Sequence, residues 1–263
     1  FEEAAKFRAA RRLWARLVEE RFDPDDPAST QLKFHTQTGG STLTAQQIEN
    51  NVVRVAYQAL AAVLGGTQSL HTNGKDEALA LPTEESVRTA LRTQQILAHE
   101  SGAADTIDPL AGSYYVESLT DELEAAAREI VEEVDRRGGA LAAVESGWVE
   151  RQIQDVAFER QREIEAGERV IVGVNAFEAD EEPEMDLEAV DPEREAAQRE
   201  RLAAVKRDRD DAAVDDALNA VRAAARGDDN VLPPILEAVK AYATVQEISD
   251  VFRDEFGEYT PNR

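Results

Sequence analysis

The amino-terminal part of the chain alternates between helix-like and strand-like hydrophobic patterns. Residues 1–22 carry apolar side chains at the spacing of one helix face, which predicts an amphipathic helix. Because no N-cap precedes this pattern, we expect the chain to begin inside an element and to be a fragment of a longer protein. Apolar runs at residues 31–38 and 67–73 predict two short strands, and residues 104–108 are a candidate third strand.

A helix is predicted after each of the first two strands. Thr44 and Gln47 have the spacing of a capping box, which predicts that Thr44 is the N-cap of a helix ending at Gly65. The second helix follows a proline and has Thr83 as its predicted N-cap. Strands and helices that alternate at regular spacing are typical of βαβ units with a parallel sheet. The pattern therefore predicts an α/β fold, either a barrel or an open sheet.

From residue 117 onward the pattern predicts helices almost alone. Helical patterns cover residues 121–135, 140–166, 194–226 and 232–256. Thr244 and Glu247 form a second predicted capping box inside the last of these. Residues 170–174 predict a short strand or extended segment, and the acidic residues around two prolines at 178–193 predict a mobile linker.

The charge of the chain is strongly negative. Acidic residues outnumber basic residues 54 to 29, which gives a formal net charge of −25. Such a field disfavours binding to nucleic acids and to anionic membranes. Few of the basic residues are lysine, and acidic surfaces that are poor in lysine suit molar salt, where charges are screened within about 3 Å. We therefore predict a salt-adapted source, with an acidic face for a cationic partner as the alternative.

Other global features limit the class of protein. No apolar run approaches the ~18 residues of a membrane span, and no signal-peptide pattern opens the chain, so we expect a cytoplasmic protein. The chain has no cysteine, which excludes disulfides and thiolate metal sites within it. No HExxH motif or histidine cluster indicates a zinc site, and we predict no metal ligand.

Polar residues mark the carboxyl ends of the two predicted strands. Each strand ends in a His-Thr-polar triplet, which begins at His35 in the first and at His71 in the second. The carboxyl ends of parallel strands commonly line an active site, although such residues also satisfy loop backbone groups. The similarity of the two triplets favours one shared pocket. The residues expected to line it are His35, Gln37, His71 and Asn73.

Glycines and acidic residues lie in the loops beyond these strands. Gly39 and Gly40 lack the spacing of the nucleotide-binding glycine motifs, but they allow the backbone to approach something flat or bulky. Asp76 and Glu77 follow an Asn-Gly turn and are expected in the first turn of a helix. A carboxylate at the mouth of a pocket also suits a hydroxyl group of a ligand.

Four segments of the chain resemble the methylmalonyl-CoA mutase family. The longest covers residues 34–86 and begins with FHTQTGGSTLTAQQIENN. The others are DPLAGSYYVE at 108–117, VIVGVNAF at 170–177 and TVQEISDVF at 244–252. Their order and spacing agree with the family along nearly the whole chain, which is therefore similar to the C-terminal part of a large, substrate-binding subunit.

The resemblance implies an α/β fold that contains the C-terminal portion of a (β/α)8 TIM-type barrel, followed by a mostly helical region. Residues 1–116 would supply the last βα units of the acyl-CoA-binding barrel, and residues 117–177 a helical extension packed on it. Residues 178–193 would form the acidic linker, and residues 194–263 a C-terminal helical region.

The resemblance also implies an isomerase that interconverts (R)-methylmalonyl-CoA and succinyl-CoA by a radical rearrangement with adenosylcobalamin. Gln37 and Glu77 match family positions near the adenosyl group. Gly40, Glu77 and Ala80 match positions that contact the cobalamin, and His35 matches a substrate-pocket position. No residue of the chain is assigned to a catalytic role.

The lower cobalt ligand is expected from another domain or chain. The family's cobalamin-binding domain carries Asp-x-His-x-x-Gly, and none of the three histidines of this chain has an aspartate two residues before it. We therefore expect a cobalamin-binding domain or small subunit as partner, an acyl-CoA as substrate, and an oligomeric enzyme.

Several residues depart from the family pattern and widen the range of possible functions. They are Ser41, Glu49, Lys75 and Leu110. The related mutases of isobutyryl-CoA, ethylmalonyl-CoA and 2-hydroxyisobutyryl-CoA are therefore alternatives for the acyl group. Two different classes of protein also fit the sequence pattern. One is a non-catalytic acidic helical interaction protein, and the second is an unrelated barrel enzyme that uses His35 and His71 as acid and base.

Overall fold

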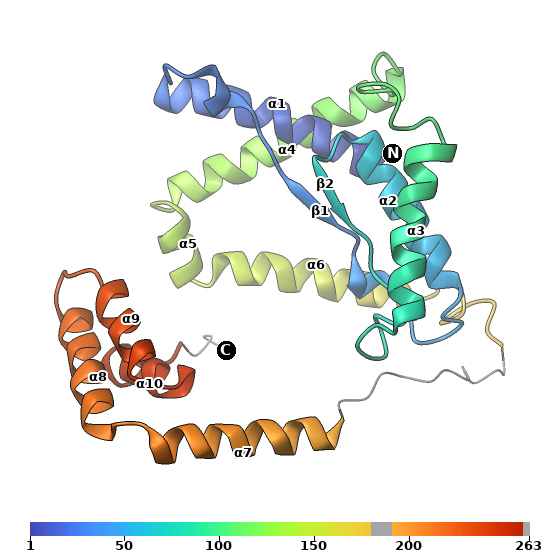
Figure 1. Ribbon diagram of the computed structural model, residues 1–263. Coiled ribbons are helices and arrows are strands. Elements are labelled where there is room, and N and C mark those ends of the chain that lie inside the picture. Colours follow the sequence, from blue (N-terminus) through green and yellow to red (C-terminus); the bar gives the residue numbers. More distant parts are fainter. Residues whose placement is uncertain (180–190, 260–263) are drawn as a thin grey trace. The chain divides into compact units, whose positions relative to one another are not determined.

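The computed structural model describes residues 1–179 and 191–259. The chain forms two compact units, Phe1–Ala189 and Val190–Arg263, and each is described by itself. Figure 1 shows helices in both units and strands only in the first. Most described residues lie in helices.

The first unit contains a short parallel sheet of two strands within the described residues. Strand β1 (His35–Gln37) pairs with β2 (Ser69–His71) in a register that places Gln37 opposite His71. Helix α2 (Asn50–Leu64) connects the two strands, and α3 (Glu84–Glu100) follows β2. The structure therefore confirms the two predicted strands, their parallel pairing and the two helices that follow them.

Residues 104–108, the candidate third strand, form turns instead. Gly102 has a φ of 69° and accepts a hydrogen bond from the Asp105 amide, which turns the chain directly after α3. Asp108 also has a positive φ, and its carboxylate accepts from Arg8 of α1 (Glu2–Phe22) at 2.9 Å. The backbone is bent at both ends of this segment and cannot continue as a strand.

Helix α1 packs along α4 (Tyr114–Arg136) through alternating ionic and apolar contacts. Arginines spaced by one helical turn on α1 meet acidic residues spaced by one turn on α4, because residues four apart share a helix face. Arg8 donates to Glu117 at 2.8 Å, and Glu124 accepts from both Arg12 and Arg16. Glu124 is buried, and Val116 and Leu13 are among the buried apolar residues of the two helices.

The structure corrects the predicted helical patterns of the first unit. Thr44 does not cap a helix: its hydroxyl donates to the Gln46 carbonyl, and Gln47 has a φ of 47°, so α2 begins only at Asn50. Residues 140–166 form two helices, α5 (Ala140–Glu145) and α6 (Trp148–Glu165), because Gly147 has a left-handed φ of 68°. Left-handed backbone cannot continue an α-helix.

The extended segment predicted at residues 170–174 is a tight turn. A bridge between Val172 and Ala176 closes it, and Asn175 holds it through a hydrogen bond from the Ile171 amide. Arg54 of α2 donates to the Val172 carbonyl at 2.7 Å. This contact ties the turn to the helix that follows β1.

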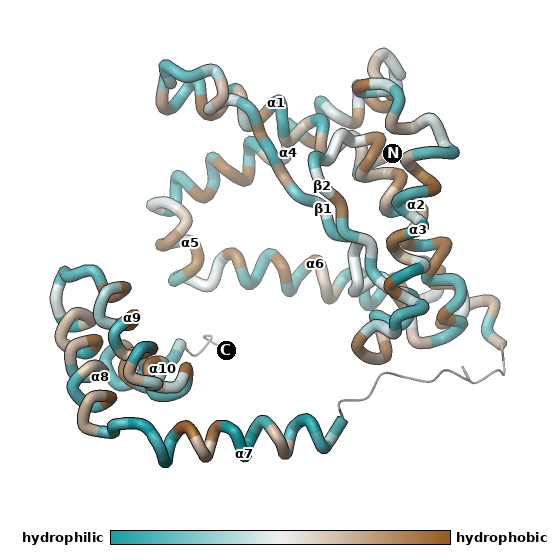
Figure 2. Tube along the Cα trace, viewed as in Figure 1, coloured by the Kyte–Doolittle hydropathy of each residue, from teal (hydrophilic) through white to brown (hydrophobic). Residues whose placement is uncertain are grey.

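The second unit is helical throughout its described residues. It contains α7 (Pro192–Asp208), α8 (Asp211–Arg226), α9 (Leu232–Lys240) and α10 (Val245–Phe256). Its core is formed by Val221, Ala238 and Val251 from the last three of these helices. Helix α7 has no buried residue and is polar along most of its length (Figure 2).

The structure confirms the predicted start of the last helix of this unit and corrects the predicted pattern of its first helices. Thr244 and Glu247 form the predicted capping box at the start of α10. The helical region predicted from residue 194 to 226 consists of two helices, because the backbone is extended at Arg209 and Asp210 caps the next helix. Helix α7 also starts earlier than predicted, at Pro192. The predicted linker falls largely on residues 180–190, which lie outside the described residues.

No helix of the described residues is both long enough and apolar enough to cross a membrane.

Candidate functional site

The two strands present one polar and one partly buried face. Side chains alternate along a strand, so His35 and Gln37 of β1 lie on the same face as Ser69 and His71 of β2. All four are exposed, whereas Thr36 and Leu70 on the other face are half-buried. The His35 ring contacts the Ser69 hydroxyl at 2.7 Å between Nδ1 and Oγ. The polar triplets of the two strands therefore lie side by side, as the parallel pairing requires, and the pocket that they would share stays a prediction.

A polar cluster forms where both strands end. Gln37 donates from its amide nitrogen to Asn73 Oδ1 at 3.2 Å. The Asn73 backbone amide donates to the Thr38 hydroxyl at 3.0 Å, and the Thr38 amide donates to the His71 carbonyl at the same distance. These bonds join the loops that follow β1 and β2, and they bury Thr38 and Asn73.

Gly40 brings this cluster against Glu77. A Cβ atom added to Gly40 would lie 2.7 Å from Asn73 Nδ2 and 2.9 Å from Glu77 Oε1, both closer than side-chain contacts permit. The absence of a side chain therefore lets the backbone at residue 40 touch both polar groups. We call Gln37, Gly40, Asn73 and Glu77 the strand-end cluster.

Asn73 carries an unpaired hydrogen-bond donor into the cluster. Only 2% of the residue is exposed, yet its Nδ2 has no hydrogen-bond partner, alone among the buried side-chain nitrogen and oxygen atoms of residues 1–179 and 191–259. A buried donor without an acceptor costs about 1 to 3 kcal/mol. Most buried polar groups in native structures are paired, so Asn73 is an unusual position.

The remaining predicted site residues lie beside the cluster. Ala80 is half-buried and lies on the loop of Glu77, where its amide donates to the Asp76 carbonyl at 3.1 Å. His35 lies on the polar face of β1, two residues before Gln37, and contacts Ser69 rather than the cluster. The contacts thus join Gln37 to Asn73 and bring both Asn73 and Glu77 against Gly40, and they leave His35 and Ala80 at the margin.

Two buried polar residues support the loop of Glu77. Asp76 is fully buried and accepts from the Ser86 hydroxyl and the Thr83 amide, so its expected place in the first turn of a helix is wrong. Asn51 of α2 is also fully buried, and its amide nitrogen donates to the Lys75 carbonyl at 2.8 Å. No pattern in the sequence marks either residue as buried. An asparagine among the apolar positions of α2 is the only signal, and it is weak.

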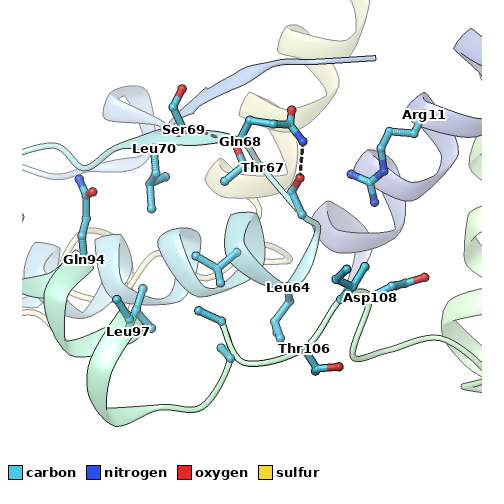
Figure 3. Close-up of a pocket in the computed structure, with 16 residues that line it drawn as sticks. Arg11, Leu64, Thr67, Gln68, Ser69, Leu70, Gln94, Leu97, Thr106 and Asp108 are labelled. Carbon is cyan, nitrogen blue, oxygen red and sulfur yellow. Dashed lines mark hydrogen bonds between the residues drawn. The ribbon is translucent and has the colours of Figure 1, made fainter. Parts of the chain in front are cut away.

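A separate cavity lies at the opposite end of the sheet. It has a volume of about 590 Å³, and its lining includes Thr67, Gln68 and Ser69, which lead into the amino end of β2 (Figure 3). Arg11 of α1 also lines it and donates to the Gly65 carbonyl at 2.6 Å. None of the five predicted site residues lines this cavity. The strand-end cluster, rather than this cavity, is therefore the candidate site.

Comparison with known proteins identifies the family. The methylmalonyl-CoA mutase family model matches residues 1–258, which is nearly the whole chain. The chain belongs to the methylmalonyl-CoA mutase family. This membership confirms the resemblance that the four sequence segments indicated. The salt-adapted source stays a prediction.

Several members of the mutase family are similar to this chain over nearly its full length. The large subunit of 2-hydroxyisobutanoyl-CoA mutase from Aquincola tertiaricarbonis is 47% identical over 98% of this chain and 46% of its own length. The methylmalonyl-CoA mutases of Rhizobium meliloti and Escherichia coli are 48% and 46% identical, and the chain covers 37% and 36% of their lengths. The chain therefore spans less than half the length of these mutases.

Proposed function

We propose that this chain is part of a cytoplasmic, adenosylcobalamin-dependent acyl-CoA mutase that interconverts (R)-methylmalonyl-CoA and succinyl-CoA. Family membership and the relatives named methylmalonyl-CoA mutase support the proposal. The structural observation that carries it is the strand-end cluster, where the exposed Glu77 packs against Gly40 at the carboxyl ends of the strands. This part of the mutase would supply one wall of the cofactor-facing mouth of a barrel.

The chemistry of the cluster fits the cofactor. Gly40 lets the backbone pack closely against Asn73 and Glu77, because no side chain projects from it, and this would place Glu77 at the mouth that faces the cofactor. Glu77 is exposed and its carboxylate can accept hydrogen bonds from ribose hydroxyl groups, while the buried Asn73 holds the Gln37 side chain. Gln37 would face the adenosyl group from the end of β1, and Ala80 would contact the cobalamin beside Glu77.

The residues of this chain would bind and orient rather than react. Adenosylcobalamin, when bound, supplies the radical that abstracts a substrate hydrogen, and the protein's share is orientation and the exclusion of water. Glu77 would hold the adenosine, and the amide of Gln37, fixed by Asn73, would limit its movement. His35 would face the acyl-CoA from the polar face of β1.

The complete mutase needs groups beyond this chain. We propose that a cobalamin-binding domain or small subunit supplies the lower cobalt ligand, and that the enzyme is an oligomer. The rest of the barrel would bind most of the coenzyme A and select the acyl group.

A second candidate substrate is a 2-hydroxyacyl-CoA such as 2-hydroxyisobutyryl-CoA. The identities to the 2-hydroxyisobutanoyl-CoA mutase subunit and to the Rhizobium meliloti methylmalonyl-CoA mutase are 47% and 48%, so similarity does not separate the two substrates. Turnover of each acyl-CoA by the complete mutase that contains this chain separates them.

The cofactor role is tested by Glu77→Gln in that complete mutase. The substitution removes the charge but keeps the size, so we expect adenosylcobalamin to bind roughly tenfold more weakly, as for loss of one charge-assisted hydrogen bond. Glu129→Gln, an exposed glutamate of α4, is the matched control and should leave affinity unchanged. Equal cofactor affinity of the Glu77→Gln variant and the wild type would contradict the assignment.

A further inference from the structure

The loop that carries Glu77 is held by the residues just before it. Residues 72–83 connect β2 to α3 and include turns at 75–79, in which the amides of Leu79 and Ala80 both donate to the Asp76 carbonyl at 2.8 and 3.1 Å. Turns of this kind have few internal bonds, so their conformation depends on side-chain anchors. Glu77 itself is exposed and has no such anchor among the described hydrogen bonds.

Asp76 is the strongest of these anchors. Its carboxylate is fully buried and accepts from the Ser86 hydroxyl at 2.6 Å and from the Thr83 amide at 2.8 Å. Both donors are neutral and lie at the amino end of α3, where Thr83 is the N-cap. The free backbone amides and the dipole of a helix amino end stabilise a negative charge there. Asp76 therefore attaches the loop to α3.

Gly74 packs directly against the hydrogen bond between Asp76 and Ser86. A Cβ atom at Gly74 would lie 2.5 Å from both Asp76 Oδ1 and Ser86 Oγ. Ser86 is fully buried as well. On the other side of the loop, Asn51 holds the Lys75 carbonyl, and the Lys75 ammonium pairs with Glu49 at 2.7 Å. Consecutive residues 75 and 76 are thus attached to α2 and to α3, and Glu77 follows directly.

We propose that Asp76 is a positioning residue, which fixes the Glu77 carboxylate against Gly40 through its hydrogen bonds to Thr83 and Ser86. The inference rests on the proposed cofactor role of Glu77. Asp76 is buried and turned toward α3, so it would not touch the cofactor. Asp76 would instead set the position of the Glu77 carboxylate through the backbone that joins the two residues. This role gives a reason for a buried carboxylate directly before an exposed one.

The test is a double-mutant cycle of Asp76→Asn and Glu77→Gln in the complete mutase, read as the dissociation constant of adenosylcobalamin. Asparagine keeps the shape of Asp76 but can accept from only one of the two donors with its single oxygen. We expect Asp76→Asn alone to weaken cofactor binding roughly tenfold. In the Glu77→Gln background the same change should have an effect below about twofold, because residues acting through one group are not additive.

Two further variants separate positioning from general destabilisation. If Asp76→Asn folds poorly, Ser86→Ala takes its place. It removes one donor and leaves the Thr83 bond, so we expect a smaller loss of cofactor affinity. Glu124→Gln alters another buried carboxylate, on α4, and should lower stability without changing cofactor affinity. Additive effects of Asp76→Asn and Glu77→Gln on cofactor affinity would overturn the proposal.

A ligand-free measurement keeps the inference distinct from the cofactor assignment. Amide hydrogen exchange of Glu77, Leu79 and Ala80 should speed up in Asp76→Asn without cofactor, while exchange in α4 stays unchanged. If Glu77→Gln binds the cofactor normally while amide exchange rises in Asp76→Asn, the cofactor role of Glu77 is refuted and the positioning role of Asp76 is supported. Unchanged exchange at these amides would refute the positioning whatever the cofactor does.

Discussion

Replacing Gly40 by alanine tests the closest packing in the candidate site. The new methyl group would lie 2.7 Å from Asn73 Nδ2, about 0.7 Å short of the 3.4 Å at which ordinary contact begins. It would lie 2.9 Å from Glu77 Oε1, about 0.5 Å short of the same limit. One or both polar groups must therefore move.

The two polar groups differ in how easily they move. Glu77 is exposed and can rotate into solvent, which moves its carboxylate away from the cluster. Asn73 is 2% exposed and bonded to Gln37, so it can move only by straining its surroundings. Overpacking of this kind costs about 1 to 3 kcal/mol, and we expect the lower end because Glu77 can yield. Sites lose function when groups shift by about 0.5 Å, so cofactor affinity should fall roughly tenfold.

Gly39→Ala is the matched control on the adjacent residue. A Cβ atom there would meet the Thr42 side chain at 3.5 and 3.7 Å, which are ordinary contacts, and the φ of −76° suits alanine. Alanine in place of glycine at a compatible position stabilises by about 0.4 to 1 kcal/mol, because it restricts the unfolded chain. The two substitutions should therefore change stability with opposite signs.

The assay pairs urea unfolding of the 263-residue chain with adenosylcobalamin titration of the complete mutase. Gly40→Ala should lower the unfolding free energy and the cofactor affinity, whereas Gly39→Ala should lower neither. If both variants bind the cofactor as the wild type does and unfold alike, the close approach at Gly40 does not serve a ligand.

Three further predictions concern the stability of the two units. Thr244→Ala removes the N-cap of α10 and should cost about 1 kcal/mol, seen as faster amide exchange in its first turn; unchanged exchange there would show that the capping box is dispensable. Hydrogen bonds from Arg209, and from Thr244, hold the pKa of Glu247 well below its ordinary value of 4.5, so this stabilisation is complete above pH 4.5 and declines as the pH falls below it toward the lowered pKa. Glu247→Gln should flatten that part of the stability–pH curve, and an equally steep curve would contradict the assignment. Glu124→Gln should cost about 1 to 2 kcal/mol in urea unfolding, because Glu124 is buried between two arginines, and a loss no larger than that of Glu129→Gln would refute it.

Local sequence patterns predicted correctly the helix starts that depend only on residues close by in the chain. The caps at Thr83 and Thr244 follow from the few residues after each, and both are present. The same reasoning fails at Thr44, because its backbone is bonded to Asn51 and its hydroxyl accepts from Arg54, both further along the chain. Tertiary contacts there outweigh a local cap worth about 1 kcal/mol.

The sequence by itself determined the parallel βαβ arrangement, the polar triplets at the strand ends and, by its resemblance, the family. It also placed Gln37, Gly40 and Glu77 among the candidate site residues. Only the tertiary structure decided that Gly40 touches Asn73 and Glu77, that Asn73 keeps an unpaired donor, and that Asp76 faces α3 rather than solvent. The physical reason is that burial and close contact join residues from separate elements, whose approach no local periodicity or cap encodes.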